Sequence, residues 1–529
     1  MNFTLSKTLR IGASAVCLSA VVMMGVCGQK DKGGAPIISA EKAPLGLSSL
    51  SDKDLARHFS VPKRITDDVE AKKALAALGL TESNSNGLSW DSQKGSGGNY
   101  IFTNMKSASS DGMITIAKAE IFGVHMNGED ATFDRADFGN VSLTGEDVKL
   151  NVDSMSLSRP TAATAKALIN SLEDLTKDTD LDFGDNADFG FGALSMKSVN
   201  ITAAELTGTI DQLVWGKDDT TGRADVKVGN VDLTLPLEGS DVASLMTLKS
   251  FSARGINTDD ISKGFTAGAN GNASSLSSML AGFNVYKKPY DSVKLEGFKY
   301  DSAAVNVDMP KIEAETNVKG DITTVTQLLS PMTIQVNDGA KGSAGQAYDM
   351  LQQLGFDKMT FKSSQTTVLD KGKDTMEVKD GIFDMAEGFR LNYTYGTSGL
   401  KALADTQRDQ TAQLNNVLEN MKINGMTLSL EDKSIVERGL KLAGQLRGAS
   451  PDRVKQEMRA ALAFAPLAAR NSLEKEIIGE LGGAFMDFID DGGTLTIQLD
   501  PAAPIAFSAL ENPEKVSPKD LGFSARQDN

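Results

Sequence analysis

The stretch Val148-Lys149-Leu150-Asn151-Val152 decides the fold, because apolar and polar side chains alternate along it without a break. Successive side chains of a β-strand point to opposite faces, so this alternation predicts a strand with one buried and one solvated face. The same period of two recurs in residues 100–103 and 113–116, and residues 94–99 place three glycines before the first of these runs. We therefore expect an antiparallel meander of strands joined by short turns.

Three short patterns occur twice in the same order, at offsets of 85, 88 and 90 residues. They pair residues 117–123 with 202–208, residues 135–137 with 223–225, and residues 139–144 with 229–234. Three matches in register predict a duplicated unit of meander and helix, in which Glu120 and Glu205 occupy equivalent positions. Looser units of the same kind are expected at residues 291–354 and 358–395.

Helices are expected after each meander. Asp67 and Glu70 form a capping-box-like start, and Gly79 is a stop signal, so residues 66–78 are predicted to be helical. Further helices are predicted at residues 161–175, 240–248 and 344–354.

Residues 399–490 change to a helical pattern, in which Pro451 takes the favoured first position of one helix. The next helix carries an apolar stripe that we expect to be core: Ile477, Ile478, Leu481, Ala484, Phe485, Phe488 and Ile489. Residues 494–499 alternate again and predict a closing strand. The fold class is therefore α+β: repeated antiparallel β-meander units with interspersed helices and a helical C-terminal region.

The chain divides by composition into six segments. They are an export signal at 1–27, a flexible tether at 28–50, an N-terminal β-rich region with two repeat units at 51–257, a flexible loop and helix at 258–290, further β-rich units at 291–398, and a helical region closed by a strand at 399–529. The Gly, Ser and Asn residues of 268–278 fit a plain flexible loop or a mobile lid over a pocket.

The composition excludes several function classes. The formal net charge of −16 repels phosphate backbones and anionic headgroups, so neither nucleic-acid binding nor attachment to lipid through a basic patch is expected. Both cysteines, Cys17 and Cys27, lie in the first 27 residues, and the only histidines are His58 and His125. This scarcity removes the usual nucleophiles, bases and transition-metal ligands.

The two histidines are therefore expected to be packing residues without a second base or ligand nearby. We expect His58→Ala and His125→Ala to keep activity and to cost packing energy alone. Trp215 also lies in a strand pattern and is predicted to pack in the same way.

The first residues have the pattern of an export signal. Lys7 and Arg10 precede an apolar run from Ile11 to Val26, which is shorter than the roughly 20 residues that a membrane-spanning helix needs. Cys27 and the polar residues after it resemble the cleavage region of bacterial lipoproteins, in which the cysteine carries the lipid. Met24 and Val26 stand where that family has Leu and a small residue. An uncleaved membrane anchor and cleavage with release remain open.

The sequence contains two further candidate sites, an acidic loop and one serine. The loop carries five alternating or near-alternating carboxylates, Asp178, Asp180, Asp182, Asp185 and Asp188, which can wrap a calcium ion or form a solvated loop. Phe183 and Phe189 interrupt the helix–loop–helix calcium pattern, so the solvated loop is preferred. Ser472 and Lys475 have the spacing of penicillin-recognising enzymes, but no Lys-Thr-Gly follows, and we assign no catalytic residue, cofactor or metal.

The repeated strand–hairpin–strand units, the closing strand from Gly492 to Pro501 and the export signal together resemble the AsmA-like and YdgA-like bacterial envelope proteins. The likeness spans about residues 80 to 500. It implies an extended sheet with a hydrophobic inner face that serves envelope maintenance or lipid movement. The sequence thus predicts a non-enzymatic envelope protein outside the cytoplasm, in the periplasm or at the outer membrane, as a scaffold or binder of an apolar ligand. Its partners would be the membrane, through the N-terminal anchor, and lipid or envelope proteins. The alternative is an adhesin-like module for protein or glycan.

Overall fold

The structure is a computed structural model. It describes residues 42–61, 63–83, 87–109, 112–173, 190–204, 206–235, 243–257, 288–338, 343–401, 419–469, 472–511 and 516–528. Two compact units emerge: unit 2 holds residues Ser48–Thr258 and Val293–Ala303, and unit 1 holds the remainder.

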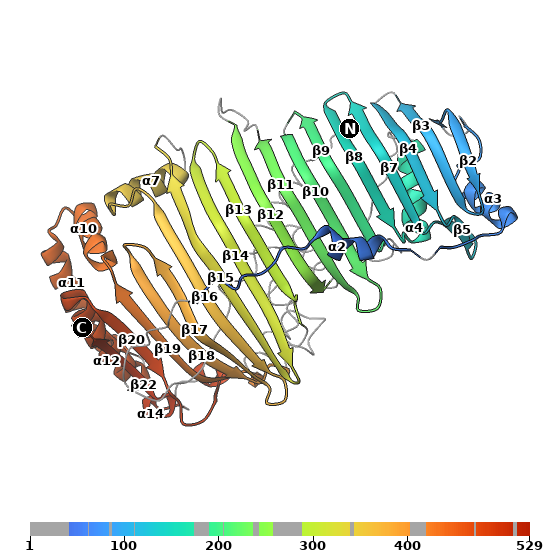
Figure 1. Cartoon of the computed structure of the whole chain (residues 1–529). Helices are drawn as coiled ribbons and strands as arrows, with labels where there is room; N and C mark the ends of the chain where they lie inside the picture. Colours follow the sequence, from blue (N-terminus) through green and yellow to red (C-terminus); the bar gives the residue numbers. More distant parts are fainter. Residues whose placement is uncertain are drawn as a thin grey trace. The chain divides into compact units, whose positions relative to one another are not determined.

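Unit 2 is built on an antiparallel meander (Figure 1). Its main strands are β3 (Asn99–Ser109), β4 (Gly112–Phe122), β7 (Arg135–Gly145), β8 (Val148–Ser158), β9 (Ala193–Ala203), β10 (Leu206–Asp218), β11 (Arg223–Leu235) and β12 (Ser244–Asn257). Each pairs with the next in this order, while β1 (Leu88–Ser89) and β2 (Ser92–Ser96) pair with the free side of β3. β5 (His125–Asn127) and β6 (Asp130–Thr132) form a separate hairpin, and β13 (Ser292–Asp301) lies beside β12, since Ser250 donates to Glu296 at 3.2 Å.

The pairing register aligns apolar side chains into rows that cross all eight main strands. The first apolar row is Phe102, Ala119, Phe138, Met155, Met196, Leu213, Val228 and Phe251. The second is Tyr100, Ile121, Ala136, Leu157, Leu194, Trp215, Val226 and Ala253. The third is Met105, Ile116, Val141, Val152, Val199, Ile210, Val231 and Leu248. One face of this sheet is therefore apolar from strand to strand.

A crease runs across the sheet between the first and third rows. On every second strand one residue of the crease has a positive φ: Asn104 at 51°, Asn140 at 52°, Ser198 at 51° and Asn230 at 40°. Asparagine tolerates this left-handed conformation better than most residues. The crease shifts the alternation by one residue, so Ala136 and Phe138 before Asn140 and Val141 and Leu143 after it join the same core cluster.

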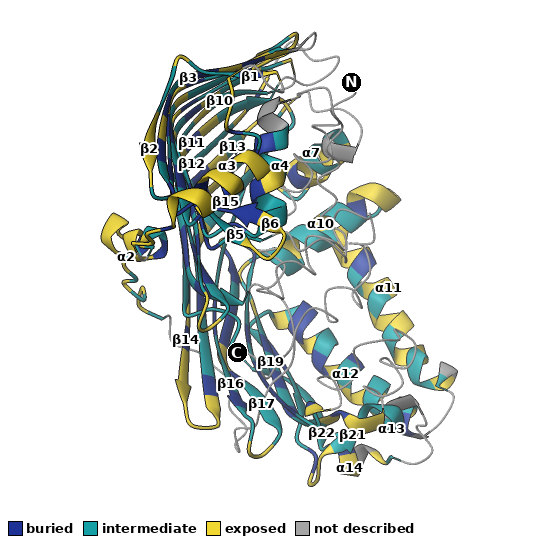
Figure 2. Ribbon diagram, turned by 90° about the vertical axis from the view of Figure 1, so that its right-hand side faces the viewer, coloured by how far each residue is buried: buried dark blue, intermediate teal, exposed yellow. Residues whose placement is uncertain are grey.

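Helices cover one part of the apolar face of unit 2. α3 (Asp68–Ala77) begins at its N-cap Asp67, and α4 (Ala162–Glu173) follows β8. Their buried side chains, including Leu75 and Ile169, share one core cluster with strands β1 to β4 and β7 to β9. α2 (Asp52–Ala56) and the short η2 (Arg57–Phe59) lie on the opposite face (Figure 2).

Unit 1 contains a second antiparallel meander. Its strands are β14 (Val305–Lys319), β15 (Ile322–Val336), β16 (Met359–Asp370), β17 (Thr375–Met385), β18 (Phe389–Ser398), β19 (Lys422–Asp432), β20 (Thr494–Leu499), β21 (Ile505–Ala506) and β22 (Phe523–Asp528). β14 to β20 pair in sequence order, β22 pairs with β20, and β21 pairs with β19.

The helices of unit 1 gather on one face of this sheet (Figure 2). They are α7 (Ser343–Gln353), α10 (Ile435–Arg447), α11 (Pro451–Phe464), η3 (Ala465–Ala468), α12 (Ser472–Asp491), α13 (Phe507–Glu511) and α14 (Pro518–Leu521). Ala484 and Phe488 of α12 pack against Leu430, Leu495 and Ile497 of β19 and β20. The part of the predicted apolar stripe around Ala484, Phe485 and Phe488 is thus core, as expected. No helix in the part of the chain that the structure describes is long and apolar enough to cross a membrane.

Several elements differ from the sequence expectations. The described residues are mostly antiparallel β-sheet with fewer helices, instead of a balanced α+β mixture. The helix predicted at 240–248 is wrong, because residues from Ser244 form β12. The region 399–490 is not uniformly helical, since Lys422–Asp432 form β19. In both cases the helical pattern of the sequence is weak. The segment forms a strand instead, because it pairs with the neighbouring strand and its apolar side chains pack on one face of the sheet. The helices predicted at 66–78, 161–175 and 344–354 are confirmed as α3, α4 and α7.

Two of the three matches of the predicted repeat lie at equivalent positions of two strands. Arg135 and Arg223 each begin a strand, β7 and β11, and Asn140 and Asn230 are the positive-φ residues of those strands. The first match is wrong: residues 117–120 lie inside β4, whereas Ala203 ends β9 and Leu206 begins β10. The recurring Gly-Asn-Val sequence thus marks the crease.

Candidate functional site

Most residues singled out as candidate sites lie outside the described residues. These are Cys17, Cys27 and the five aspartates 178, 180, 182, 185 and 188. Ser472 is the first residue of α12. His125 is half-buried on β5, and its Nδ1 atom lies 2.7 Å from the carbonyl oxygen of Gly123. The described residues contain no group of three or more His, Cys, Asp or Glu side chains that could hold a metal ion.

Strands β9 to β12 of unit 2 carry an apolar patch. It comprises six half-buried side chains: Met196, Leu213, Trp215, Val226, Val228 and Phe251. They belong to the first and second apolar rows and are direct cross-strand neighbours. Trp215, expected to be a packing residue, lies in this patch.

The patch begins where the helix-covered core ends. The core cluster under α3 and α4 reaches as far as Leu194 of β9, and none of the six patch residues belongs to it. Their rows nevertheless continue without a polar residue to β12. Among the described residues, this part of the face therefore offers apolar side chains that folding has only half removed from water, which is typical of surfaces that bind apolar partners.

The opposite face of unit 2 carries residues 48–59, which we call the N-terminal strap. Ser51 caps α2 by accepting from the Asp54 backbone N–H at 3.2 Å, while the Ser51 N–H donates to the Asp54 carboxylate at 3.0 Å. Leu50 and Leu55 are buried against Val214 of β10. The strap is thus docked on the sheet by a small apolar contact.

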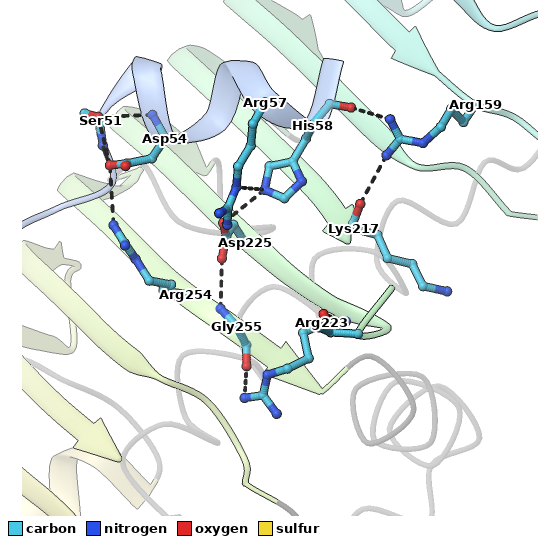
Figure 3. A network of polar contacts seen from close by, with 11 residues as sticks. Ser51, Asp54, Arg57, His58, Arg159, Lys217, Arg223, Asp225, Arg254 and Gly255 are labelled. Carbon is cyan, nitrogen blue, oxygen red and sulfur yellow. Dashed lines mark hydrogen bonds and ion pairs between the residues drawn. The ribbon is translucent and has the colours of Figure 1, made fainter. Parts of the chain in front are cut away.

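A buried carboxylate fixes the end of the strap (Figure 3). Asp225, on β11, accepts from Arg57 Nη2 at 2.6 Å and from the backbone N–H of Gly255 at 2.9 Å. Its Oδ2 atom also lies 3.0 Å from Nε2 of His58, whose side chain is only 4% exposed. Because a carboxylate only accepts hydrogen bonds, Nε2 carries the proton. The expectation that His58 has no second base or ligand nearby is therefore wrong, because the carboxylate of Asp225 lies beside its ring.

The electrostatics of this cluster favour the ionised carboxylate. Burial alone would raise the pKa of Asp225, but hydrogen bonds from His58, Gly255 and Arg57 outweigh it and lower the pKa to about 2. A hydrogen bond from Lys227 likewise lowers the pKa of Asp52 in the strap.

Further polar contacts connect the strap to the same strands (Figure 3). Arg159 donates to the carbonyl oxygens of His58 at 2.8 Å and Lys217 at 3.1 Å. Arg254 of β12 pairs with Asp54 at 3.3 Å, and Arg223 donates to the carbonyl oxygen of Gly255. Gly216 is needed beneath the strap, since a Cβ there would lie 2.3 Å from the His58 ring.

This arrangement holds a segment in place and does not resemble a catalytic site. The carboxylate of Asp225 accepts from three donors that belong to the fold itself. The nearby hydroxyl of Ser158 donates to the His58 carbonyl at 3.4 Å and not to its ring. A nucleophile activated by His58 is therefore not formed by the described residues. The cluster is a clamp for the strap.

Unit 1 has a similar clamp on its own sheet. The backbone N–H groups of Leu45 and Leu47 each donate to the carboxylate of Glu313 at 3.1 Å. Glu313 is 2% exposed and pairs with Lys311 at 2.8 Å. The predicted tether of residues 28–50 is thus an ordered, docked segment from residue 42 onward.

Sequence reasoning missed both clamps. The Arg-Ala-Asp pattern that includes Asp225 occurs twice in the sequence, yet in β7 the equivalent Asp137 pairs with its own Arg135 at 2.9 Å. The partners of Asp225 come from the strap, 167 and 168 residues earlier. A local pattern carries no signal for so distant a contact.

A family model described as "Uncharacterized protein" matches residues 382–528, which run from β17 to β22 and include α10 to α12. No curated protein matches the sequence. The matched residues make up less than half of the chain, so the match does not assign the chain to a family.

Proposed function

We propose that this protein is a non-enzymatic component of the bacterial cell envelope that binds an apolar ligand on the β9–β12 apolar patch. The observation that carries the proposal is the continuation of the apolar rows past the helix-covered core. Burial of apolar area contributes roughly 25 cal/mol per Å², so a sheet face of this kind favours acyl chains without any catalytic group.

The N-terminal sequence supports a location outside the cytoplasm. Lys7, Arg10 and the apolar run to Val26 support export, and Cys27 supports lipidation and anchoring. Cys27→Ser should abolish incorporation of radioactive palmitate, whereas Cys17→Ser should leave it unchanged. Persistence of the label in Cys27→Ser would reject this anchor.

The adhesin-like alternative receives no support from the described surface. Exposed aromatics on loops would favour it, but the only aromatic among the strongly exposed apolar side chains of the described residues is Phe464, the last residue of α11.

Native mass spectrometry of protein extracted from its own membrane tests the binding proposal. We expect co-purified lipid with the unmutated protein and less with Val228→Asn, which places an amide in the first apolar row. Asp232→Asn, an exposed change on the same strand, is the matched control and should keep the lipid. Absence of lipid from the unmutated protein, together with failure to bind an added fluorescent fatty acid, would overturn the proposal.

A further inference from the structure

The apolar face of unit 1 contains a row of polar side chains that folding does not explain. Gln327 of β15 and Gln365 of β16 are direct cross-strand partners and are 8% and 7% exposed. Towards the C-terminus the same row continues through Tyr393 and the apolar side chains of Leu428 and Ile497. Burying an amide in an apolar face costs free energy unless its hydrogen bonds are made.

Gln327, Gln365 and Tyr393 of this row form one hydrogen-bonded series with Tyr290, which we call the Tyr-Gln network. Gln327 donates from Nε2 to the Tyr290 hydroxyl at 3.2 Å. Gln365 donates to Oε1 of Gln327 at 2.6 Å, and Tyr393 donates to Oε1 of Gln365 at 3.0 Å. Each of the two glutamine carbonyls therefore has a donor.

The donors of the network are not all used. A glutamine amide has two N–H groups, and each amide here donates once. The Tyr290 hydroxyl accepts and still has its own proton to give. Among the described residues, one N–H of Gln327, one N–H of Gln365 and the O–H of Tyr290 have no acceptor. Three donors without acceptors in one network point to a ligand that brings an acceptor oxygen.

The side chains around the Tyr-Gln network indicate that the acceptor oxygen of the ligand is neutral. The rows on both sides contain Leu329, Ser363 and Phe383, and Val325, Thr367 and Val378, none of which is charged. Burial raises the pKa of Tyr290 and of Tyr393, so both hydroxyls remain protonated near neutral pH. A buried anion would need a cation here, whereas a neutral carbonyl needs donors alone.

The backbone is shaped to complete the network. Tyr393 reaches Gln365 across β17 at Gly381, where a Cβ would lie 2.4 Å from the tyrosine ring. The register shifts at this point of the β16–β17 and β17–β18 ladders. A side chain at residue 381 would displace Tyr393 from Gln365.

We propose that the Tyr-Gln network binds the ester carbonyl of an acyl lipid whose hydrocarbon lies along the neighbouring apolar rows of unit 1. The proposal rests on the proposed function, because it extends acyl-lipid binding to a second site and names the chemical group recognised there. This site lies within unit 1, with Gln327, Gln365 and Tyr290 as the donors, and uses none of the residues of the β9–β12 apolar patch.

The test uses the full chain and two probes, methyl palmitate labelled with ¹³C at its carbonyl and hexadecane. We expect the infrared carbonyl band of bound methyl palmitate to shift to lower frequency, as hydrogen bonding requires. The double variant Gln327→Met and Gln365→Met should abolish the shift and weaken ester binding about tenfold or more, with hexadecane binding unchanged. Gln335→Met, an exposed change on the same strand, is the matched control.

Tyr290→Phe guards against a misfolded double variant, because it removes one O–H and keeps the ring. It should reduce the band shift and retain the native circular dichroism spectrum. Ester binding with no band shift in the unmutated protein would overturn this inference and leave the proposed function standing. Failure to bind either probe would overturn both.

Discussion

The apolar faces of the two units differ at their centres. In unit 2 the row from Phe102 to Phe251 is apolar on every strand, so the hydrophobic effect alone accounts for it. In unit 1, a cross-strand row on the apolar face is interrupted by the polar side chains of Gln327 and Gln365. Burying these amides opposes folding, which indicates that the interruption serves recognition.

The polar faces differ in how they hold the N-terminal segment. In unit 2, Asp225 accepts from the side chains of Arg57 and His58, so the clamp depends on charge. In unit 1, Glu313 accepts from two backbone N–H groups, so its clamp holds the backbone of the N-terminal segment and not its side chains. The first clamp should therefore be the more sensitive to substitution of the side chains that it holds.

The largest expected effect is that of Asp225→Ala. Removing the acceptor leaves the buried His58 and the Gly255 N–H without a partner, and we expect a loss of about 3 kcal/mol in the free energy of unfolding. Asp137→Ala, the equivalent position of β7, should lose less than about 1 kcal/mol because that ion pair is partly solvated. Urea unfolding followed by tryptophan fluorescence measures both, since Trp90 and Trp215 are in unit 2. Equal losses would contradict the special role of Asp225.

The free energy of unfolding of unit 2 should depend on pH through the Asp225 carboxylate of the same clamp. The pKa of Asp225 is about 2 in the folded protein and about 3.9 in an unfolded chain. Because the pKa is lowered in the folded protein, the ionised carboxylate stabilises the fold at pH values above the unfolded pKa. This stabilisation is lost as the pH falls through the folded pKa, so the free energy of unfolding should decrease by about 2 kcal/mol between pH 5 and pH 2. Comparing the urea midpoints of the unmutated protein and Asp225→Ala across this range isolates the effect. Parallel curves for the two proteins would refute it.

Gly381→Ala should disturb unit 1 alone. The added Cβ meets the Tyr393 ring, and overpacking of this kind costs roughly 1–3 kcal/mol. Hydrogen exchange should accelerate in β16 to β18, while the tryptophan-monitored unfolding of unit 2 stays unchanged. Gly439→Ala, where a Cβ meets nothing, is the control.

The smallest effect is expected at the crease. Asn230→Val forces a β-branched residue into a positive φ and should cost about 1–2 kcal/mol, whereas Asn230→Gly should cost little. Asn200→Val, at an exposed strand position of β9 with ordinary φ, should be nearly neutral. Thermal unfolding of the three variants checks the order. A loss in Asn200→Val as large as in Asn230→Val would show that the crease conformation is not the cause.

The sequence predicts a good part of this fold and little of its sites. Alternation in residues 148–152 identifies β8, and Asp67 identifies the start of α3, because both signals are local. The crease was visible as the recurring Gly-Asn-Val, but its meaning requires the register of neighbouring strands. Strand β12 was mistaken for a helix because Ser244 to Leu248 has no clear alternation.

The clamps and the Tyr-Gln network could not be predicted for a different reason. Asp225 and Arg57 are 168 residues apart, and Gln327 and Gln365 are 38 residues apart. A polar residue in a strand reads as solvent-facing when its neighbours are unknown. Gln327 follows the alternation that predicts burial, but nothing local shows that an amide takes that place.

Photolabelling with a palmitate analogue that carries a diazirine at the end of its acyl chain tests the central claim most directly. We expect labelled peptides from β10 and β11, around Leu213, Trp215 and Val228, and loss of this label when hexadecane competes. Labelling confined to the exposed helix end around Phe464 and Leu467, with β10 and β11 unlabelled, would contradict the claim that the apolar rows of unit 2 bind the ligand.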